Sequence, residues 1–238
     1  MTTTTLGYAF LGGLLPSFIW LYFLLKEDAR CPEPRKLIAL AFVAGMAAVP
    51  LALWFEQFTQ TYLGDPKTLV LGTVIAWASI EEVLKYAMAA IFILWRSAVD
   101  ESLDYIIYMM TVALGFAAAE NMLFLFTPLS NGNIITGFFT GDVRFIGANL
   151  LHVVASAAIG FALAFSRAYR PSMRILTSIG GLILAIALHT AFNMLIMRQG
   201  SSIELAAFLF VWLIAVIFLA AFEVLKYFRY RNLPNNTC

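Results

Sequence analysis

The sequence predicts an all-α protein, a polytopic bundle of about seven transmembrane helices in a single membrane-embedded domain, residues 1–238. Of its residues, 62% are apolar and only 12% are charged, and the mean hydropathy is +0.86. Soluble domains of this size are roughly half apolar and a quarter charged. Seven apolar runs have about the 20 residues that a helix needs to cross a bilayer core of about 30 Å. A net charge of +1, with no basic arm, predicts no nucleic-acid partner.

Polar connections such as "YLGDPK" and "SRAYRPSMR" separate the runs, as turns exposed to water should. The first run has no basic residue before it and no small-residue cleavage site after it, so we expect a retained helix rather than a signal peptide. The expected spans are Leu6 to Leu25, Leu37 to Phe55, Thr68 to Trp95, Tyr105 to Phe126, Phe145 to Phe165, Ile175 to Met197 and Leu205 to Phe222.

Lys and Arg are unevenly distributed between the two sets of alternate loops. One set holds eleven, the other holds three, and Lys85 lies inside the third span. Because cytoplasmic loops carry the basic excess, we expect the N-terminus outside the cell membrane and the C-terminus in the cytoplasm.

The third span carries three charges at its centre, Glu81, Glu82 and Lys85, within "SIEEVLKYA". At mid-bilayer each costs about 2.5 to 3.5 kcal/mol unless something compensates. Their spacing of three and four residues places all three on one arc of the helix. We therefore expect this arc to face the interior of the bundle or a cavity.

The next three spans add polar residues at a similar depth. Glu120 and Asn121 lie in the fourth span, His152 in the fifth, and His189 with Asn193 in the sixth. At about 1.5 Å per residue, the ionisable groups of these spans and the glutamate pair fall within about 7 Å of one depth. The last span differs, because its copy of the pentapeptide "EVLKY" (Glu223 to Tyr227) lies at the cytoplasmic end and serves as an anchor.

Hydrogen bonding between helices is the plain alternative for such residues, and taken alone Asn121 and Ser156 fit it best. Five ionisable residues from four spans at one depth instead favour a functional site, because ionisable groups inside membranes are expensive to bury.

The residue types suit hydrolysis by an activated water. One glutamate of the pair, kept ionised by Lys85, can act as the general base. His189 and Asn193 lie on one helix face and can donate hydrogen bonds to an oxyanion, while His152 orients the water or passes a proton. No Ser/His/Asp triad, H-E-x-x-H or nucleotide-binding motif is present in the sequence.

A metal-dependent alternative uses the same residues differently. His152, His189 and Glu120 would be three ligands of a catalytic zinc ion, with water as the fourth and Glu81 as the base. The sequence leaves both versions open, because ligands from three separate helices form no local spacing motif.

These motifs, E-E-x-x-K (Glu81, Glu82, Lys85), F-x-x-x-E-N (Phe116, Glu120, Asn121), a helical His152 and H-x-x-x-N (His189, Asn193), resemble the PrsW family of intramembrane proteases. More distantly, they are similar to the superfamily of CAAX prenyl proteases and bacteriocin-processing enzymes. The resemblance covers about residues 70 to 200, with a catalytic core at about 68–200. In the superfamily, the second motif usually carries His where this chain has Glu120.

The resemblance implies a glutamate-type or metallo-type endopeptidase that cuts membrane-embedded or membrane-anchored proteins, with anti-sigma factors as one substrate type. A proton-coupled transporter or channel with a buried Glu/His relay is the alternative function. Transporters usually show inverted repeats or broken helices at matching positions, and the sequence shows neither.

Overall fold

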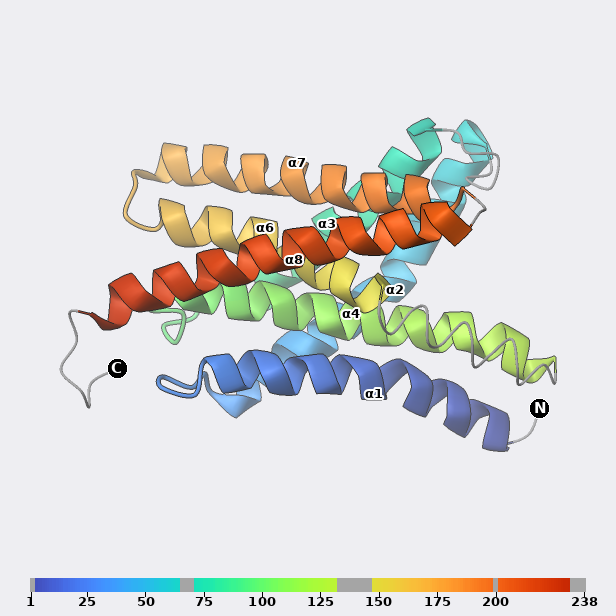
Figure 1. Cartoon of the computed structure of the whole chain (residues 1–238), viewed down its shortest axis with the longest axis horizontal. Helices are drawn as coiled ribbons and strands as arrows, with labels where there is room; N and C mark the ends of the chain where they lie inside the picture. The colour runs from blue at the N-terminus through green and yellow to red at the C-terminus, as the bar shows by residue number, and fades with distance from the viewer. Residues whose placement is uncertain (1–2, 65–70, 132–146, 199–200, 232–238) are drawn as a thin grey trace.

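The computed structural model describes residues 3–64, 71–131, 147–198 and 201–231, and within these ranges it is entirely helical apart from turns. Figure 1 shows the helices running roughly along the long axis of the molecule, with α1 beginning and α8 ending at opposite ends. The helices are α1 (Thr3–Glu27), α2 (Arg35–Leu63), α3 (Leu71–Phe92), α4 (Ser102–Ser130), α6 (Asn149–Ser166), α7 (Pro171–Ile196) and α8 (Ser201–Tyr230).

Each expected span corresponds to one of these helices, so the all-α bundle is confirmed. The helix ends differ, because α2 continues to Leu63 and α8 to Tyr230, beyond the predicted ends at Phe55 and Phe222. Hydropathy marks only the apolar part of a helix, whereas backbone hydrogen bonding continues into the polar interface. The predicted starts of the third span at Thr68 and of the fifth span at Phe145 lie outside the described residues.

Helix α4 lies at the centre of the bundle, packed against α1, α2 and α6; α7 packs on the other side of α6, and α8 lies alongside α6, α7 and α4. Helix α3 packs between α2 and α7. Of the described residues of α6, almost all are buried, which fits its position between α4 and α7. This arrangement brings α3, α4, α6 and α7 around one interior space.

Two glycines allow α2 and α4 to approach closely. A Cβ atom at Gly45 would clash with the carbonyl oxygen of Val112, and one at Gly115 would clash with the carbonyl oxygen of Phe42. Only residues without a side chain permit backbones this close, as in other membrane helix pairs. The contact places Phe116, the residue after Gly115, against the interior space.

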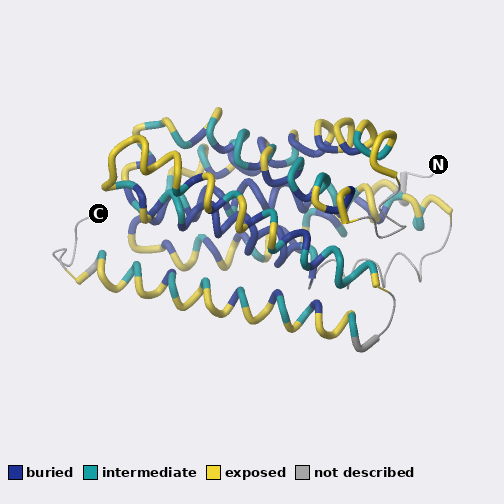
Figure 2. The backbone as a smooth tube through the Cα atoms, turned by 90° about the horizontal axis from the view of Figure 1, so that it is seen from above, coloured by how far each residue is buried: buried dark blue, intermediate teal, exposed yellow. Residues whose placement is uncertain are grey.

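The outer surface of the bundle is apolar. Figure 2 shows buried residues concentrated in the centre and exposed residues facing outward along the helices. Many of the exposed residues are large hydrophobics, for example Leu209, Leu213 and Val216 on α8. Six of the described helices are long and apolar enough to cross a membrane, all except α3. Helix α3 differs because Glu81, Glu82 and Lys85 lie in its 22 residues.

One end of the bundle, at which α1 ends, α2 begins and α8 ends, carries most of the arginines and lysines; we call it the basic end. Ion pairs join its helices. Lys226 of α8 bonds Glu27 of α1 and Glu223 at 2.8 Å each, and Arg229 pairs with Glu101 at the start of α4. The second "EVLKY" therefore stands at a helix end, as expected from its position. That the basic end is cytoplasmic stays a prediction.

Candidate active site

The three charged residues of α3 are buried in the interior space and contact one another. Lys85 and Glu82 are fully buried, and Glu81 is nearly so. The Lys85 ammonium donates to Glu82 Oε1 at 2.8 Å and lies 3.5 Å from Glu81 Oε2. Because these residues are three and four apart, one helical face presents all three groups to the other helices.

His152 of α6 joins this group through both ring nitrogens. Its Nδ1 lies 2.7 Å from Lys85 Nζ, and its Nε2 lies 3.1 Å from Glu120 Oε2 of α4. A charged lysine has donors only, so Nδ1 accepts a hydrogen bond and Nε2 carries the proton that Glu120 accepts. A continuous chain of hydrogen bonds therefore runs from α3 through α6 to α4.

Glu82 is the most fully engaged carboxylate of the cluster. In addition to Lys85, its Oε1 accepts a hydrogen bond from His189 Nδ1 of α7 at 2.8 Å. Its Oε2 accepts one from Ser156 Oγ of α6 at 3.3 Å. With both oxygens bonded, Glu82 fixes the orientation of His189 and holds α3, α6 and α7 together.

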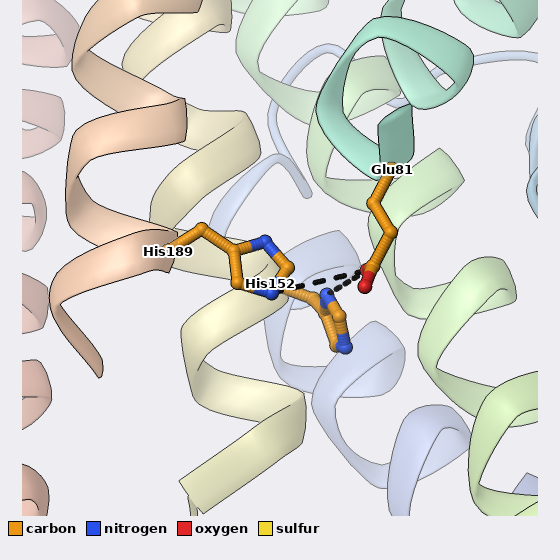
Figure 3. A group of neighbouring side chains, drawn as sticks. All are labelled: Glu81, His152 and His189. Atoms are coloured by element: carbon orange, nitrogen blue, oxygen red, sulfur yellow. Dashed lines mark ion pairs between the residues drawn. The ribbon is translucent and has the colours of Figure 1, made fainter. Parts of the chain in front are cut away.

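Glu81 faces the two histidines without contacting either directly. Its Oε2 lies 3.9 Å from His152 Nδ1 and 3.9 Å from His189 Nε2, and Figure 3 shows the carboxylate pointing toward both rings. The rings stand edge to face with centroids 5.3 Å apart. Glu81 Oε2 and His189 Nε2 are 3.9 Å apart. A water about 2.8 Å from each of these two atoms would form an angle of about 90° with them, which is acceptable for hydrogen bonding. One water to the side of the line that joins these two atoms could therefore bridge Glu81 and His189.

An aromatic ring closes one side of the cluster. The Phe116 ring lies 4.3 Å from Lys85 Nζ and 5.4 Å from the His152 ring. A cation over an aromatic face is stabilised where water is absent, so this contact offsets part of the cost of burying the ammonium.

The remaining residues singled out in the sequence lie at the edges of this cluster. Asn121 is buried and donates to Asn149 Oδ1 at 3.2 Å, on the side of α4 toward α6. Asn193 lies one turn beyond His189 on α7 and is partly exposed. Among the described residues, no recorded side-chain contact joins Asn193 to the cluster.

Sequence reasoning missed two kinds of residue near the cluster. Asn149, fully buried three residues before His152, accepts hydrogen bonds from Asn121 and from Ser17 of α1. Its spacing from His152 was a signal, because residues three apart share a helix face.

Glu56 of α2 is buried, and its charge interacts with those of Glu81 and Glu120. It lies one residue past Phe55, the predicted end of the second span.

The cluster has the donor types that zinc uses, a carboxylate and two imidazoles. The ligand atoms of Glu81, His152 and His189 all lie within 4.8 Å of one another, whereas Glu120 bonds the opposite nitrogen of His152. The other ring nitrogen of His189, Nδ1, donates a hydrogen bond to the Glu82 carboxylate, as the second nitrogen of a histidine ligand usually does. Lys85 Nζ, however, occupies the lone pair of His152 Nδ1 at 2.7 Å. As these side chains lie, a metal ion does not fit unless Lys85 withdraws.

Comparison with known proteins adds an independent observation. Residues 33–222 match the PrsW-protease family, described as "PrsW family intramembrane metalloprotease". Proteins named "Protease PrsW" are similar to this chain. The one from Geobacillus kaustophilus is 28% identical over 139 residues, 52% of this chain and 61% of the relative. The one from Shouchella clausii is 22% identical over 210 residues, 87% of this chain and 93% of the relative.

The match to the Clostridioides difficile relative covers 52% of that protein at 26% identity, so this chain spans less than two thirds of the first relatives. No solved structure gives a significant match. The family match nevertheless includes the whole of α3, α4, α6 and α7, on which the cluster stands. This chain is thus a multi-pass membrane protein that belongs to the PrsW family of intramembrane proteases.

Proposed function

We propose that this protein is an intramembrane endopeptidase that hydrolyses peptide bonds of membrane-embedded or membrane-anchored proteins with a glutamate-activated water. One observation supports this most directly. The Glu81 carboxylate faces two imidazoles at 3.9 Å, a separation that one water can bridge, inside a bundle in which six of the described helices are long and apolar enough to cross a membrane. Ionisable groups are placed at such depth, at a cost, when function requires them.

Glu81 is the general base in this proposal, because it is the carboxylate of the pair that keeps accepting capacity. Glu82 already accepts hydrogen bonds from Lys85, His189 and Ser156. A water between Glu81 Oε2 and His189 Nε2 has an acceptor on each side, which leaves its own oxygen lone pairs free for attack.

Glu82 and Lys85 position these groups rather than react. Through Nδ1, Glu82 holds His189 in the tautomer whose Nε2 lone pair faces Glu81. Lys85 balances part of the negative charge of the two glutamates and locks His152 through Nδ1. The reacting groups are therefore held in place before substrate arrives, which lowers the entropic cost of reaction.

Glu81 takes one proton from the water as the oxygen forms a bond to the carbonyl carbon of the scissile peptide. The resulting oxyanion accepts a hydrogen bond from the amide of Asn193, one turn from His189. Glu81 returns its proton to the peptide nitrogen as the C–N bond breaks, and the second proton of the water stays with the new carboxyl group.

The substrate approaches from the side of Glu120 in this proposal. The side chain of Glu120 is 20% exposed, whereas those of Glu82 and Lys85 are 0% exposed. A membrane protein substrate is supported by the family and by the apolar outer surface of the bundle. Anti-sigma factors are one substrate type that fits this class.

The repeated pentapeptide provides a matched test. Glu81→Gln and Glu82→Gln should each abolish cleavage of membrane proteins in cells, while Glu223→Gln in the second "EVLKY" should leave it unchanged. Glu223 occupies the same place in the repeat as Glu82 but is exposed at the basic end. Sequencing of new N-termini in membrane fractions from cells expressing each variant measures the cleavage.

Full cleavage by both the Glu81 and the Glu82 variants would overturn the proposal. Loss of proton flux into vesicles in the same variants, with no cleavage product from wild-type protein, would instead favour a transporter. The amount of folded protein in the membrane, measured for each variant, separates lost chemistry from lost fold.

A further inference from the structure

A second pocket lies at the basic end, away from the catalytic cluster. Its volume is about 260 Å³, and its lining residues lie where α3 and α6 end and α4 and α7 begin. It is lined by Tyr86, Ala90, Leu94, Trp95, Tyr105, Leu163, Ser166, Arg167 and Arg174. Apart from the tyrosines, the ionisable groups that line this pocket are the two arginines, Arg167 and Arg174.

Neither arginine of the pocket forms an ion pair with a carboxylate of a described residue. Within the described part of the chain, the structure records no ion pair for the guanidinium of Arg167 or Arg174. Arg174 donates one hydrogen bond to the backbone carbonyl of Arg167, which draws both residues to the same wall. Asp104 is close enough for its charge to interact with that of Arg167 without forming an ion pair. Most of the donors of both guanidinium groups therefore remain available to a ligand.

Further donors and a planar surface complete the pocket. The hydroxyls of Tyr86 and Tyr105 make no recorded hydrogen bond to any described residue. Trp95, which is 70% exposed, lies under the guanidinium of Arg96 at 5.1 Å from ring to Arg96 Cζ. Tryptophan and arginine are typical of the membrane interface, which places the pocket at the level of lipid headgroups.

We propose that this pocket binds the phosphate group of an anionic membrane lipid in the leaflet at the basic end. Two arginines without carboxylate partners offer positive charge and paired N–H donors, and such a pair of donors can bind two oxygens of one phosphate group. The apolar wall, formed by Ala90, Leu94 and Leu163, suits the glycerol and first methylenes of a lipid rather than a freely soluble ion. Basic pockets between membrane helices are known to recognise such headgroups.

A bound lipid stabilises the same four helices that carry the catalytic cluster. Tyr86 follows Lys85 directly on α3, and Leu163 lies about two turns, or about 10 Å, beyond Ser156 on α6. Because the ligand bridges the ends of α3, α4, α6 and α7, its binding should raise the thermal stability of the bundle by mass action.

The test uses the purified full-length protein in a non-ionic detergent. We expect dihexanoyl phosphatidylglycerol to raise the melting temperature in a saturable manner, and phosphatidylcholine with the same chains to have little effect. Arg167→Gln and Arg174→Gln should each weaken apparent binding by at least about fivefold. Arg170→Gln is the matched control, because Arg170 is exposed in the same turn but does not line the pocket.

A charge-retaining variant covers the case in which Arg167→Gln does not fold. Arg167→Lys keeps the positive charge but loses the paired N–H donors of the guanidinium, so it should weaken binding to an intermediate extent. Inorganic phosphate at matched ionic strength distinguishes a lipid headgroup from a soluble phosphate compound as the ligand of the pocket. Saturation by phosphate alone would assign a soluble phosphate compound to the pocket. Equal effects of both lipids, or equal weakening by Arg170→Gln, would overturn the proposal.

Discussion

Lys85 is the residue on which the geometry of the cluster depends most. Its ammonium contacts Glu82 at 2.8 Å, His152 at 2.7 Å and the ring of Phe116 at 4.3 Å, and it is fully buried. A buried charge is tolerated only when paired and hydrogen bonded. Loss of Lys85 would leave the glutamate pair as buried anions without a compensating lysine.

We therefore expect Lys85→Met to lower the free energy of unfolding by about 3 to 5 kcal/mol and to abolish cleavage. Lys226→Met, at the same place in the second "EVLKY", should cost only about 0 to 1 kcal/mol, because its partners are exposed carboxylates. Thermal unfolding in detergent measures both. Equal destabilisation by the two substitutions would contradict this account of the buried cluster.

The contact between Lys85 and His152 also predicts how the protein responds to metal removal. Because Lys85 occupies the lone pair that a metal needs, cleavage should persist after dialysis against a strong chelator. Metal analysis of the purified protein provides a second measurement. A stoichiometric zinc content, with activity lost on chelation and restored by zinc, would contradict this prediction and favour the metal-dependent alternative.

At the scale of helices, the approach of α2 to α4 determines where the aromatic side of the cluster lies. Gly45 and Gly115 leave no room for a Cβ atom against the backbone of the opposite helix. Helix packing in membranes depends on such close contacts, because lipid supplies no hydrophobic drive for association between helices.

Gly115→Ala should therefore destabilise the protein by about 1 to 3 kcal/mol, because α2 must move away from α4. Gly180→Ala is the matched control. It lies in α7 with open space around the new methyl group, so better helix propensity should make it neutral or stabilising by up to about 1 kcal/mol. Melting temperatures of the two variants test this, and a similar loss in both would contradict it.

At the scale of the whole molecule, the basic end holds buried acidic groups that make stability depend on pH. Glu33, between α1 and α2, accepts a hydrogen bond from Tyr108 of α4. Burial, together with the charges of Asp104 and Asp28, raises the pKa of Glu33 to about 8. Burial likewise raises the pKa of Asp28 to about 6. The folded state therefore holds protons that the unfolded chain has already released, because the ordinary pKa is 4.5 for Glu33 and 3.8 for Asp28.

A carboxyl group with a raised pKa stabilises the fold below its ordinary value, and this contribution disappears as the pH rises through the raised value. We expect the melting temperature to fall between about pH 6 and pH 8, and Glu33→Gln to flatten that part of the curve. Glu204→Gln, at an exposed position in the first turn of α8, should leave the slope unchanged. An unchanged slope in Glu33→Gln would show that other groups cause it.

The helical architecture was predictable because it depends on local properties of the chain. A run of apolar residues must form a helix in a membrane, since only internal hydrogen bonding satisfies its backbone there. The same local reasoning singled out Glu81, Lys85, His152 and His189, because ionisable groups stand out in apolar runs. It could not place Glu56 within the bundle, because a glutamate near a helix end looks the same whether it faces lipid headgroups or the interior.

The sequence by itself determined which segments form the helices that the structure describes, their order and the residue types available for chemistry. Only the tertiary structure decided that Glu82 binds His189 and Ser156 while Glu81 lies 3.9 Å from both imidazoles, and that Glu120 bonds Nε2 of His152. The reason is physical. Helical periodicity places a side chain on a face, but the packing of α3, α4, α6 and α7 decides which atoms meet there.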